Sequence, residues 1–180
     1  MKKVLLLPGW MTALRLYKND VDDFDVYFGG LDEKSFSADY VVGLSLGAII
    51  ALYNIEKIKG KVILVNPPLP KRSLFRWLIK WVKYMVEEGL FLKRQKLTIN
   101  PIRYTKALIT CIKLLSVDFS NILDNVPKDK ITVIRGKDDR FFCDELAVNF
   151  LKSKNIKVVE VKGGHNWSEE IEETMNNLII

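Results

Sequence analysis

The sequence contains one histidine, His165, and only two cysteines, Cys111 and Cys143, among 180 residues. One imidazole cannot build a zinc site of several histidines, and two distant thiols are too few for a disulfide framework. So few cysteines favour a reducing compartment, and we expect the cytoplasm. No apolar run approaches the roughly 20 residues of a membrane-spanning helix. The run at Val4–Leu7 stops at Pro8-Gly9, too short for a signal peptide, and predicts a buried strand.

Several ligand-binding motifs are also missing. There is no GxGxxG turn for a dinucleotide, no GxxxxGK[ST] loop for nucleotide phosphates, and no acidic cluster for magnesium. We therefore expect no cofactor and no metal. The basic residues follow no recognisable nucleic-acid-binding module, so a nucleic-acid partner is not expected either.

What the sequence does contain is an uneven distribution of charge. The net charge is +6, but residues 71–113 alone hold eleven Lys and Arg against two acids, a net +9. The remaining chain is therefore at about −3 by the same formal count. A basic segment lies within a mildly acidic chain.

Short apolar runs alternate with helix-like stretches, which predicts an α/β fold with a mainly parallel sheet between helices. Six runs have the unalternating Val, Ile and Leu content of strands covered on both faces. They are Val4–Leu7, Val26–Phe28, Tyr40–Gly43, Val62–Val65, Ile131–Ile134 and Val158–Val161. Helices are predicted after Ser45, Asp144 and Asn166, the last with Asn166 and Glu169 as a capping box.

Residues 67–129 interrupt this alternation. No strand is evident there, and helices are predicted near Ser73–Val86 and Pro101–Leu115. We therefore expect an α/β core formed by residues 1–66 and 130–180, with residues 67–129 as an inserted helical cap. The basic segment coincides with this cap.

The stretch Gly43-Leu44-Ser45-Leu46-Gly47 lies where a predicted strand meets a predicted helix. A sharp strand-to-helix turn brings the residues two before and two after its apex together, so only small side chains fit at Gly43 and Gly47. The carboxyl ends of parallel strands are where ligands bind. Ser45 is therefore a candidate nucleophile, which requires a base to take its proton and a third group to orient that base.

The base and the acid candidates follow the last two predicted strands. His165 lies in Val161-Lys162-Gly163-Gly164-His165, and two aspartates lie in Gly136-Lys137-Asp138-Asp139. The order serine, aspartate, histidine, together with Leu7-Pro8-Gly9-Trp10 after the first strand, resembles the α/β-hydrolase family. The resemblance covers almost the whole chain. It implies a catalytic triad of Ser45, Asp139 and His165, because the family's acid stands three residues after the glycine; Asp138 is the alternative acid.

The same resemblance implies an oxyanion hole made by the backbone N–H groups of Trp10 and Leu46. This chain has Pro8-Gly9 where the family often has His-Gly, a change that leaves the backbone donors in place. The family's two leading antiparallel strands are missing, which implies six strands in the order 4-3-5-6-7-8 of the family's counting.

The predicted cap carries Arg72, Arg76, Lys80 and Lys83 at helical spacing, which we call the basic stripe. Three interpretations are open. The stripe is a solvated face, it docks an acidic protein that carries the substrate, or the helix lies on an anionic membrane. A basic helical cap and Gly-Leu-Ser-Leu-Gly resemble the small carboxylesterases that demethylate pimeloyl-acyl-carrier-protein methyl ester in biotin synthesis, and acyl carrier proteins are strongly acidic.

The best hypothesis from the sequence is therefore a serine carboxylesterase that forms an acyl-enzyme, with pimeloyl-acyl-carrier-protein methyl ester as the specific substrate. A thioesterase or a lipid esterase acting at a membrane surface is the alternative within enzymes. A non-enzymatic binding protein on a hydrolase scaffold is the alternative outside them.

Overall fold

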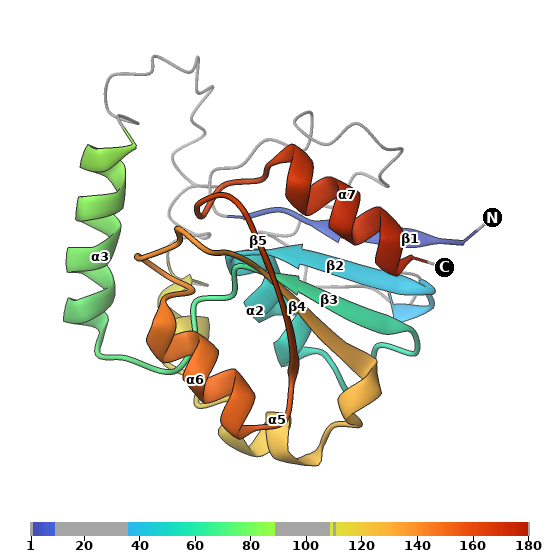
Figure 1. The fold of residues 1–180 in the computed structure, drawn as a ribbon. Helices are drawn as coiled ribbons and strands as arrows, with labels where there is room; N and C mark the ends of the chain where they lie inside the picture. The colour runs from blue at the N-terminus through green and yellow to red at the C-terminus, as the bar shows by residue number, and fades with distance from the viewer. Residues whose placement is uncertain (1, 10–35, 89–108, 110, 180) are drawn as a thin grey trace.

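The computed structural model describes residues 2–9, 36–88, 109 and 111–179. Five strands in this part form one sheet, and helices lie on both of its faces (Figure 1). The strands are β1 (Val4–Leu7), β2 (Tyr40–Leu44), β3 (Lys61–Val65), β4 (Ile131–Gly136) and β5 (Lys157–Val161). The helices are α2 (Leu46–Tyr53), α3 (Leu74–Glu87), α5 (Ser120–Asn125), α6 (Glu145–Ser153) and α7 (Glu169–Leu178), with a 3₁₀ turn at Lys128–Lys130.

The sheet is parallel throughout and its strands lie in chain order, β1-β2-β3-β4-β5. All carboxyl ends of the strands therefore meet at one edge, where a parallel sheet places its ligands. Five of the six predicted strands are confirmed, in the relative order that was predicted for them. The sixth, Val26–Phe28, lies outside the described residues, so the complete six-stranded order stays a prediction.

Alternate strand residues face opposite layers, because successive side chains of a strand point to opposite faces. Leu5, Val41 and Val62 belong to the larger apolar cluster, which includes residues of α2, α5 and α6. Leu6 and Val42 belong to the smaller cluster on the other face, which α7 covers. The continuous apolar character of these strands is thus explained by burial on both sides.

The helix boundaries follow local capping signals at two of the predicted sites. Ser73 caps α3 by accepting a hydrogen bond from the backbone N–H of Arg76 (3.3 Å), as the predicted start near Ser73 requires. Asp144 caps α6 by accepting from the N–H of Ala147 (3.2 Å). A helix also follows Asn166 as predicted, but the predicted capping residue was wrong. Ser168, not Asn166, caps α7 by accepting from the N–H of Ile171, and the Asn166 side chain accepts from the hydroxyl of Tyr84.

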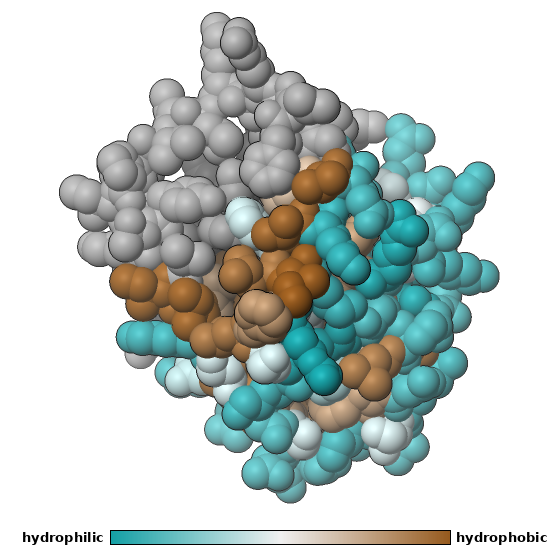
Figure 2. Space-filling view, turned by 90° about the vertical axis from the view of Figure 1, so that its left-hand side faces the viewer, coloured by the Kyte–Doolittle hydropathy of each residue, from teal (hydrophilic) through white to brown (hydrophobic). Residues whose placement is uncertain are grey.

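Helix α3 stands beyond the carboxyl edge of the sheet, apart from the helices that cover its faces (Figure 1). Apolar side chains gather on the side of the molecule where α3 lies, next to a hydrophilic area (Figure 2). Residues 111–115 are helical, in agreement with the second predicted cap helix, most of which lies outside the described residues. Phe119 and Leu123 pack in the larger apolar cluster, so the last part of residues 67–129 contributes to the main core. The cap boundary itself stays a prediction.

Within the described residues, no helix combines the length and the apolar character that crossing a bilayer requires.

Candidate active site

Ser45 occupies the turn between β2 and α2 with φ 51° and ψ −111°. A non-glycine residue at positive φ is strained, and such strain is typical of a nucleophile held at the apex of a sharp turn. A Cβ on Gly43 would lie 2.5 Å from the carbonyl carbon of Gly47, and a Cβ on Gly47 would lie 2.1 Å from the backbone oxygen of Leu7. Both contacts are impossible for real atoms. The prediction that sterics require glycine at these two positions is confirmed.

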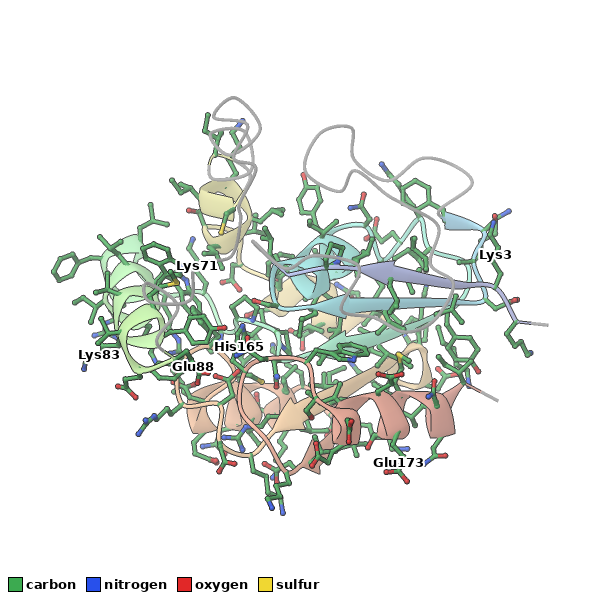
Figure 3. All side chains as sticks on the ribbon, turned by 90° about the horizontal axis from the view of Figure 1, so that it is seen from above. Lys3, Lys71, Lys83, Glu88, His165 and Glu173 are labelled. Carbon is green, nitrogen blue, oxygen red and sulfur yellow. The ribbon has the colours of Figure 1, made fainter. Side chains whose placement is uncertain are left out.

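The imidazole of His165 lies between Ser45 and Asp139. Its Nε2 is 2.9 Å from Oγ of Ser45, and its Nδ1 is 2.7 Å from Oδ2 of Asp139. The three residues come from three loops at the carboxyl edge of the sheet, after β2, β4 and β5. Figure 3 shows His165 at the α3 end of the molecule, and Lys3 and Glu173 at the opposite end.

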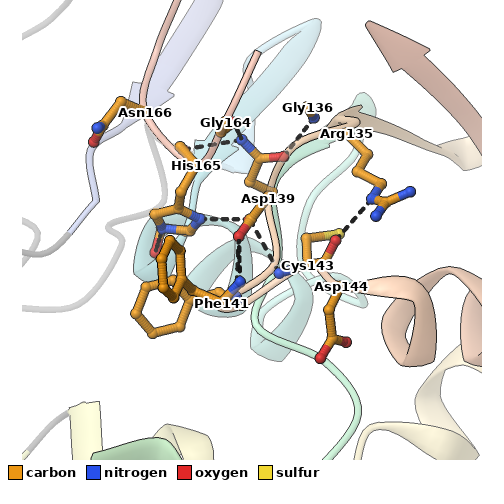
Figure 4. Close-up of polar contacts among 12 residues, drawn as sticks. Arg135, Gly136, Asp139, Phe141, Cys143, Asp144, Gly164, His165 and Asn166 are labelled. Carbon is orange, nitrogen blue, oxygen red and sulfur yellow. Dashed lines mark hydrogen bonds and ion pairs between the residues drawn. The ribbon is translucent and has the colours of Figure 1, made fainter. Parts of the chain in front are cut away.

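The carboxylate of Asp139 is fully buried and accepts three backbone hydrogen bonds. Its Oδ1 accepts from the N–H groups of Phe141 (3.1 Å) and Phe142 (3.0 Å), and its Oδ2 accepts from Cys143 (3.0 Å) (Figure 4). Burial raises the pKa of Asp139, but the positive charge available on His165 and these hydrogen bonds outweigh burial and hold the pKa below its usual value. The carboxylate is therefore ionised and can only accept hydrogen bonds.

This ionised acid fixes the tautomer of His165. Because Asp139 only accepts, the proton of a neutral imidazole resides on Nδ1, and Nε2 is left to accept the hydroxyl proton of Ser45. Asp138, the alternative acid, is exposed, and its backbone N–H donates to the carbonyl of Gly163 (2.9 Å). The structure therefore places Asp139 rather than Asp138 against the histidine.

Asn66, directly after β3, connects the loops that carry the acid and the base. Its Nδ2 donates to the carbonyl oxygens of Gly164 (3.0 Å) and His165 (2.9 Å), and its Oδ1 accepts from the N–H of Gly136 (2.8 Å). The residue is fully buried and has φ 46°, a region that asparagine tolerates better than most residues. Asn66 thus fixes the backbone of His165 against the end of the strand that precedes Asp139.

Arg135 supports the acid loop from its other side. This buried residue of β4 donates from Nε to the carbonyl of Cys143 (2.8 Å, Figure 4). Its guanidinium also forms ion pairs with Glu145 and Glu160. Cys143 also donates its N–H to Asp139, so the arginine restrains the loop that holds the acid.

Of the two predicted oxyanion donors, only Leu46 lies among the described residues. Leu46 is the first residue of α2, where backbone N–H groups have no partner within the helix and the helix dipole favours negative charge. Its position directly after Ser45 suits the predicted role. Trp10 lies outside the described residues.

A cavity of about 480 Å³ opens beside Ser45 and His165. Its walls are mainly apolar and come from α3, from the helical residues near 112 and from the loop after β3. They include Leu74, Trp77, Leu78, Trp81, Ile112, Leu115 and Pro68. An apolar chamber with a hydroxyl and an imidazole at one wall suits a ligand with an apolar chain and one polar reacting group.

Aromatic residues of α3 and of the acid loop enclose the histidine. The edge of Tyr84 meets the imidazole at 5.4 Å between ring centres, and Phe142 lies 4.4 Å from it. The hydroxyl of Tyr84 donates to Oδ1 of Asn166. Burial, with a smaller contribution from Glu88, raises the pKa of Tyr84 to about 12, so the phenol stays a neutral donor. Tyr84 thereby ties α3 to the loop that carries His165.

The four residues of the basic stripe differ in whether they form ion pairs. Arg72 precedes Ser73 and is not part of α3; it donates to Asp144 (2.8 Å), and Lys80 pairs with the same carboxylate (2.7 Å). Within the described residues, the side chains of Arg76 and Lys83 form no ion pair. The single stripe inferred from spacing therefore divides into two residues that anchor α3 to α6 and two that remain available.

No family model matches the sequence, and no curated protein matches it. Solved structures do. An α/β-hydrolase enzyme from a Medee basin deep-sea metagenome library matches with a TM-score of 0.59 and 14% identity, over 99% of this chain and 88% of that one. By this similarity, the fold of the present chain is that of the α/β-hydrolases. The N-formylmaleamic acid deformylase from Pseudomonas putida matches with a TM-score of 0.58 and 15% identity, over 99% and 92% of the two chains. The enol-lactonase from Burkholderia xenovorans matches with a TM-score of 0.56 and 18% identity, over 81% and 65%.

The sequence analysis did not predict two residues of the candidate active site, Asn66 and Tyr84. Asn66 carries a usable signal, because a polar residue directly after a buried parallel strand points to the ligand-binding edge. Tyr84 carries none, since an aromatic residue on an amphipathic helix is most simply interpreted as core.

Proposed function

We propose that the protein is a serine hydrolase that cleaves carboxylic esters through an acyl-enzyme on Ser45. The observation that carries this proposal is the continuous arrangement of Ser45, His165 and the buried Asp139. The strained turn at Ser45 and the apolar cavity beside it support the same interpretation. The names of two structural neighbours, a deformylase and an enol-lactonase, agree with hydrolysis at an acyl carbon.

The residues would act in the following sequence. Oγ of Ser45 attacks the ester carbonyl while Nε2 of His165 takes the hydroxyl proton, and Asp139 stabilises the resulting imidazolium. The backbone N–H of Leu46, with Trp10 as the predicted second donor, would donate a hydrogen bond to the negatively charged former carbonyl oxygen. His165 then gives the proton to the leaving alcohol, and the acyl group stays on Ser45. A water molecule, activated by the same imidazole, releases the acid and restores the serine.

The cavity favours esters whose acyl chain is apolar. Its described walls provide aromatic and aliphatic side chains, with polar groups concentrated at Ser45, His165 and Asn166. A free carboxylate or a sugar in the acyl group would lose hydration there without a matching partner. We therefore propose medium-chain acyl esters as the substrate class, and thioesters of the same acids as the alternative leaving group.

The carrier-protein substrate stays a prediction. Arg72 and Lys80 are already paired with Asp144. Any docking of an acidic carrier would therefore depend mainly on Arg76 and Lys83. Hydrolysis of pimeloyl-acyl-carrier-protein methyl ester by the wild-type protein and by Arg76→Glu/Lys83→Glu, compared with hydrolysis of a free methyl ester, tests it directly. A selective loss with the carrier-bound ester would support the prediction, and equal rates on both substrates in both proteins would count against it.

The function itself is tested with p-nitrophenyl esters from acetate to decanoate and with a fluorophosphonate probe. We expect turnover that is highest at intermediate chain length, and covalent labelling of Ser45 located by peptide mass spectrometry. Absence of turnover on every oxygen ester and thioester, together with no labelling of Ser45, would support the binding-protein alternative instead.

A further inference from the structure

The outer face of α3 carries a row of exposed apolar side chains. Phe75, Ile79, Val82 and Val86 are spaced by four, three and four residues, so they lie along one side of the helix. Phe75 is 71% exposed and Val86 is 63% exposed, and the other two are also open to solvent. We call these four residues the outer row. Figure 2 shows this side of the molecule, where apolar surface adjoins hydrophilic surface.

Cations border the outer row along α3. A groove of about 410 Å³ between α3 and the start of α6 is lined by Arg76 and Lys83, which face it beside Ile79. The other cations of the groove are engaged. Arg72 and Lys80 pair with Asp144, and Arg140 pairs with Glu87. Among the described residues, Arg76 and Lys83 are therefore the groove cations without an ion-pair partner.

The same helix reaches from this surface to the active site. Leu74 and Leu78 line the cavity beside Ser45, yet both are about half exposed. Leu78 lies next to the outer row on the helix, because it is three residues after Phe75 and four residues before Val82. Leu74 lies one turn before Leu78 on the same side. Apolar surface is thus continuous from the outer row, past these two leucines, to the cavity wall.

We propose that α3 binds the surface of an anionic phospholipid bilayer. The outer row inserts among the upper parts of the lipid chains, and Arg76 and Lys83 contact headgroup phosphates at the edge of the row. This is the arrangement of an interfacial amphipathic helix, whose binding combines buried apolar area with attraction to anionic lipids. It also gives an ester dissolved in the bilayer an apolar path along Leu74 and Leu78 to Ser45, a consequence that rests on the proposed function.

A bilayer fits these observations better than an acidic protein does. Docking of an acidic protein depends on several unpaired cations acting together, and two of the four basic-stripe residues are already paired with Asp144. What remains on the outer face is four large apolar side chains and two cations. A surface of that composition gains more from an apolar phase with an anionic boundary than from a charged protein face.

Vesicle flotation tests the proposal without reference to catalysis. The wild-type protein should float with vesicles of phosphatidylcholine and phosphatidylglycerol and bind vesicles of phosphatidylcholine alone at least tenfold more weakly. Phe75→Gln/Val82→Gln/Val86→Gln should weaken binding to both compositions by at least tenfold, because glutamine keeps the helix but removes the apolar surface. Arg76→Glu/Lys83→Glu should abolish the preference for the anionic vesicles, and raising salt should do the same to the wild-type protein.

Matched controls lie at the other end of the sheet. Lys152 and Lys157 are exposed at the end of α6 and the start of β5, so Lys152→Glu/Lys157→Glu changes the net charge equally but should leave flotation intact. Tyr53→Gln removes an exposed apolar side chain from the end of α2 and should also have no effect. Hydrolysis of p-nitrophenyl butyrate in solution should be unchanged in all these variants, which shows that they fold.

Two outcomes overturn the proposal. One is that the wild-type protein and the outer-row variant float equally. The other is that the wild-type protein ignores anionic vesicles but binds a purified acyl carrier protein through Arg76 and Lys83, which assigns the face to an acidic protein. Ser45→Ala should float as the wild-type protein does. If no ester is cleaved while flotation behaves as expected, the proposed function fails and the membrane-binding face stands.

Discussion

Asn66 donates a hydrogen bond of 2.9 Å to the backbone carbonyl of His165, although 99 residues separate the two in the chain. The same side chain accepts from the N–H of Gly136, three residues before Asp139. One amide therefore sets the distance between the loops of the acid and the base. The Asn66 amide bonds backbone groups of these loops and not the side chains of Ser45, His165 or Asp139. Asn66 is therefore a positioning residue.

Replacing Asn66 should lower turnover more than it changes substrate binding. Asn66→Gly keeps the backbone at φ 46° but removes the three hydrogen bonds of the buried amide. This loss should destabilise the fold by about 3 kcal/mol and reduce kcat about tenfold with KM unchanged. Asn66→Ala should be less stable than Asn66→Gly, because alanine is strained at positive φ.

Urea unfolding and steady-state kinetics well below the melting temperature check both parts. If kcat in the folded Asn66→Gly variant equals that of the wild-type protein, the residue supports the fold alone and has no role in positioning His165.

Ser45→Ala should abolish turnover without loss of stability. Removing the nucleophile of a serine triad costs about 10⁴- to 10⁶-fold in kcat. Among the described residues, the Ser45 side chain makes one hydrogen bond, to His165, and does not cap α2, so the free energy of unfolding should change by less than about 1 kcal/mol. Ester hydrolysis, probe labelling and thermal unfolding of the same preparation check the prediction. Undiminished hydrolysis in this variant would exclude Ser45 as the nucleophile.

Asp139→Asn should be damaging and Asp138→Asn mild. An amide at position 139 can donate to Nδ1 of His165, which would move the imidazole proton to Nε2 and remove the acceptor for Ser45. We expect kcat to fall by about 10³- to 10⁴-fold in Asp139→Asn. Asp138 is exposed and should matter by less than about threefold. The two variants carry the same change one residue apart, so each is the control for the other, and the reverse ranking would assign the acid to Asp138.

Asp144 should make the anchoring of α3 sensitive to acid. Burial would raise the pKa of Asp144, but hydrogen bonds from Arg72 and Lys80 outweigh burial and lower it to about 2. The pKa of the folded state is thus below that of the unfolded chain, so the stabilisation is complete above about pH 4 and is lost as the pH falls toward 2. Asp144→Asn keeps the helix cap and should cost about 1–3 kcal/mol at pH 7.

The measurement is urea unfolding of the wild-type protein and Asp144→Asn between pH 3 and pH 7. The difference between them should shrink as the pH falls. Asp124→Asn is the matched control, because Asp124 pairs with Lys154 at an exposed site and such pairs contribute about 0–1 kcal/mol. A difference for Asp144→Asn that stays constant over this range would show that its charge does not stabilise the α3 anchor.

The sequence by itself determined the features that depend on neighbours along the chain. Gly43 was predictable because the turn around Ser45 is crowded by its own backbone, whereas at Gly47 the crowding comes from the distant backbone of Leu7. The strands and α3 were predictable because side-chain periodicity and caps such as Ser73 act within a few residues. The order of Ser45, Asp139 and His165 placed all three at one edge, since parallel strands share the direction of their carboxyl ends.

The tertiary structure decided what depends on residues far apart in the chain. Asp139 and Asp138 have the same chemistry, and only the path of the loop buries one against His165 and exposes the other. Helical spacing put Arg72 and Lys80 on one face, but Asp144, 72 and 64 residues away, pairs with both. Helical spacing along the sequence cannot reveal such partners, because the fold alone determines which distant segments come into contact.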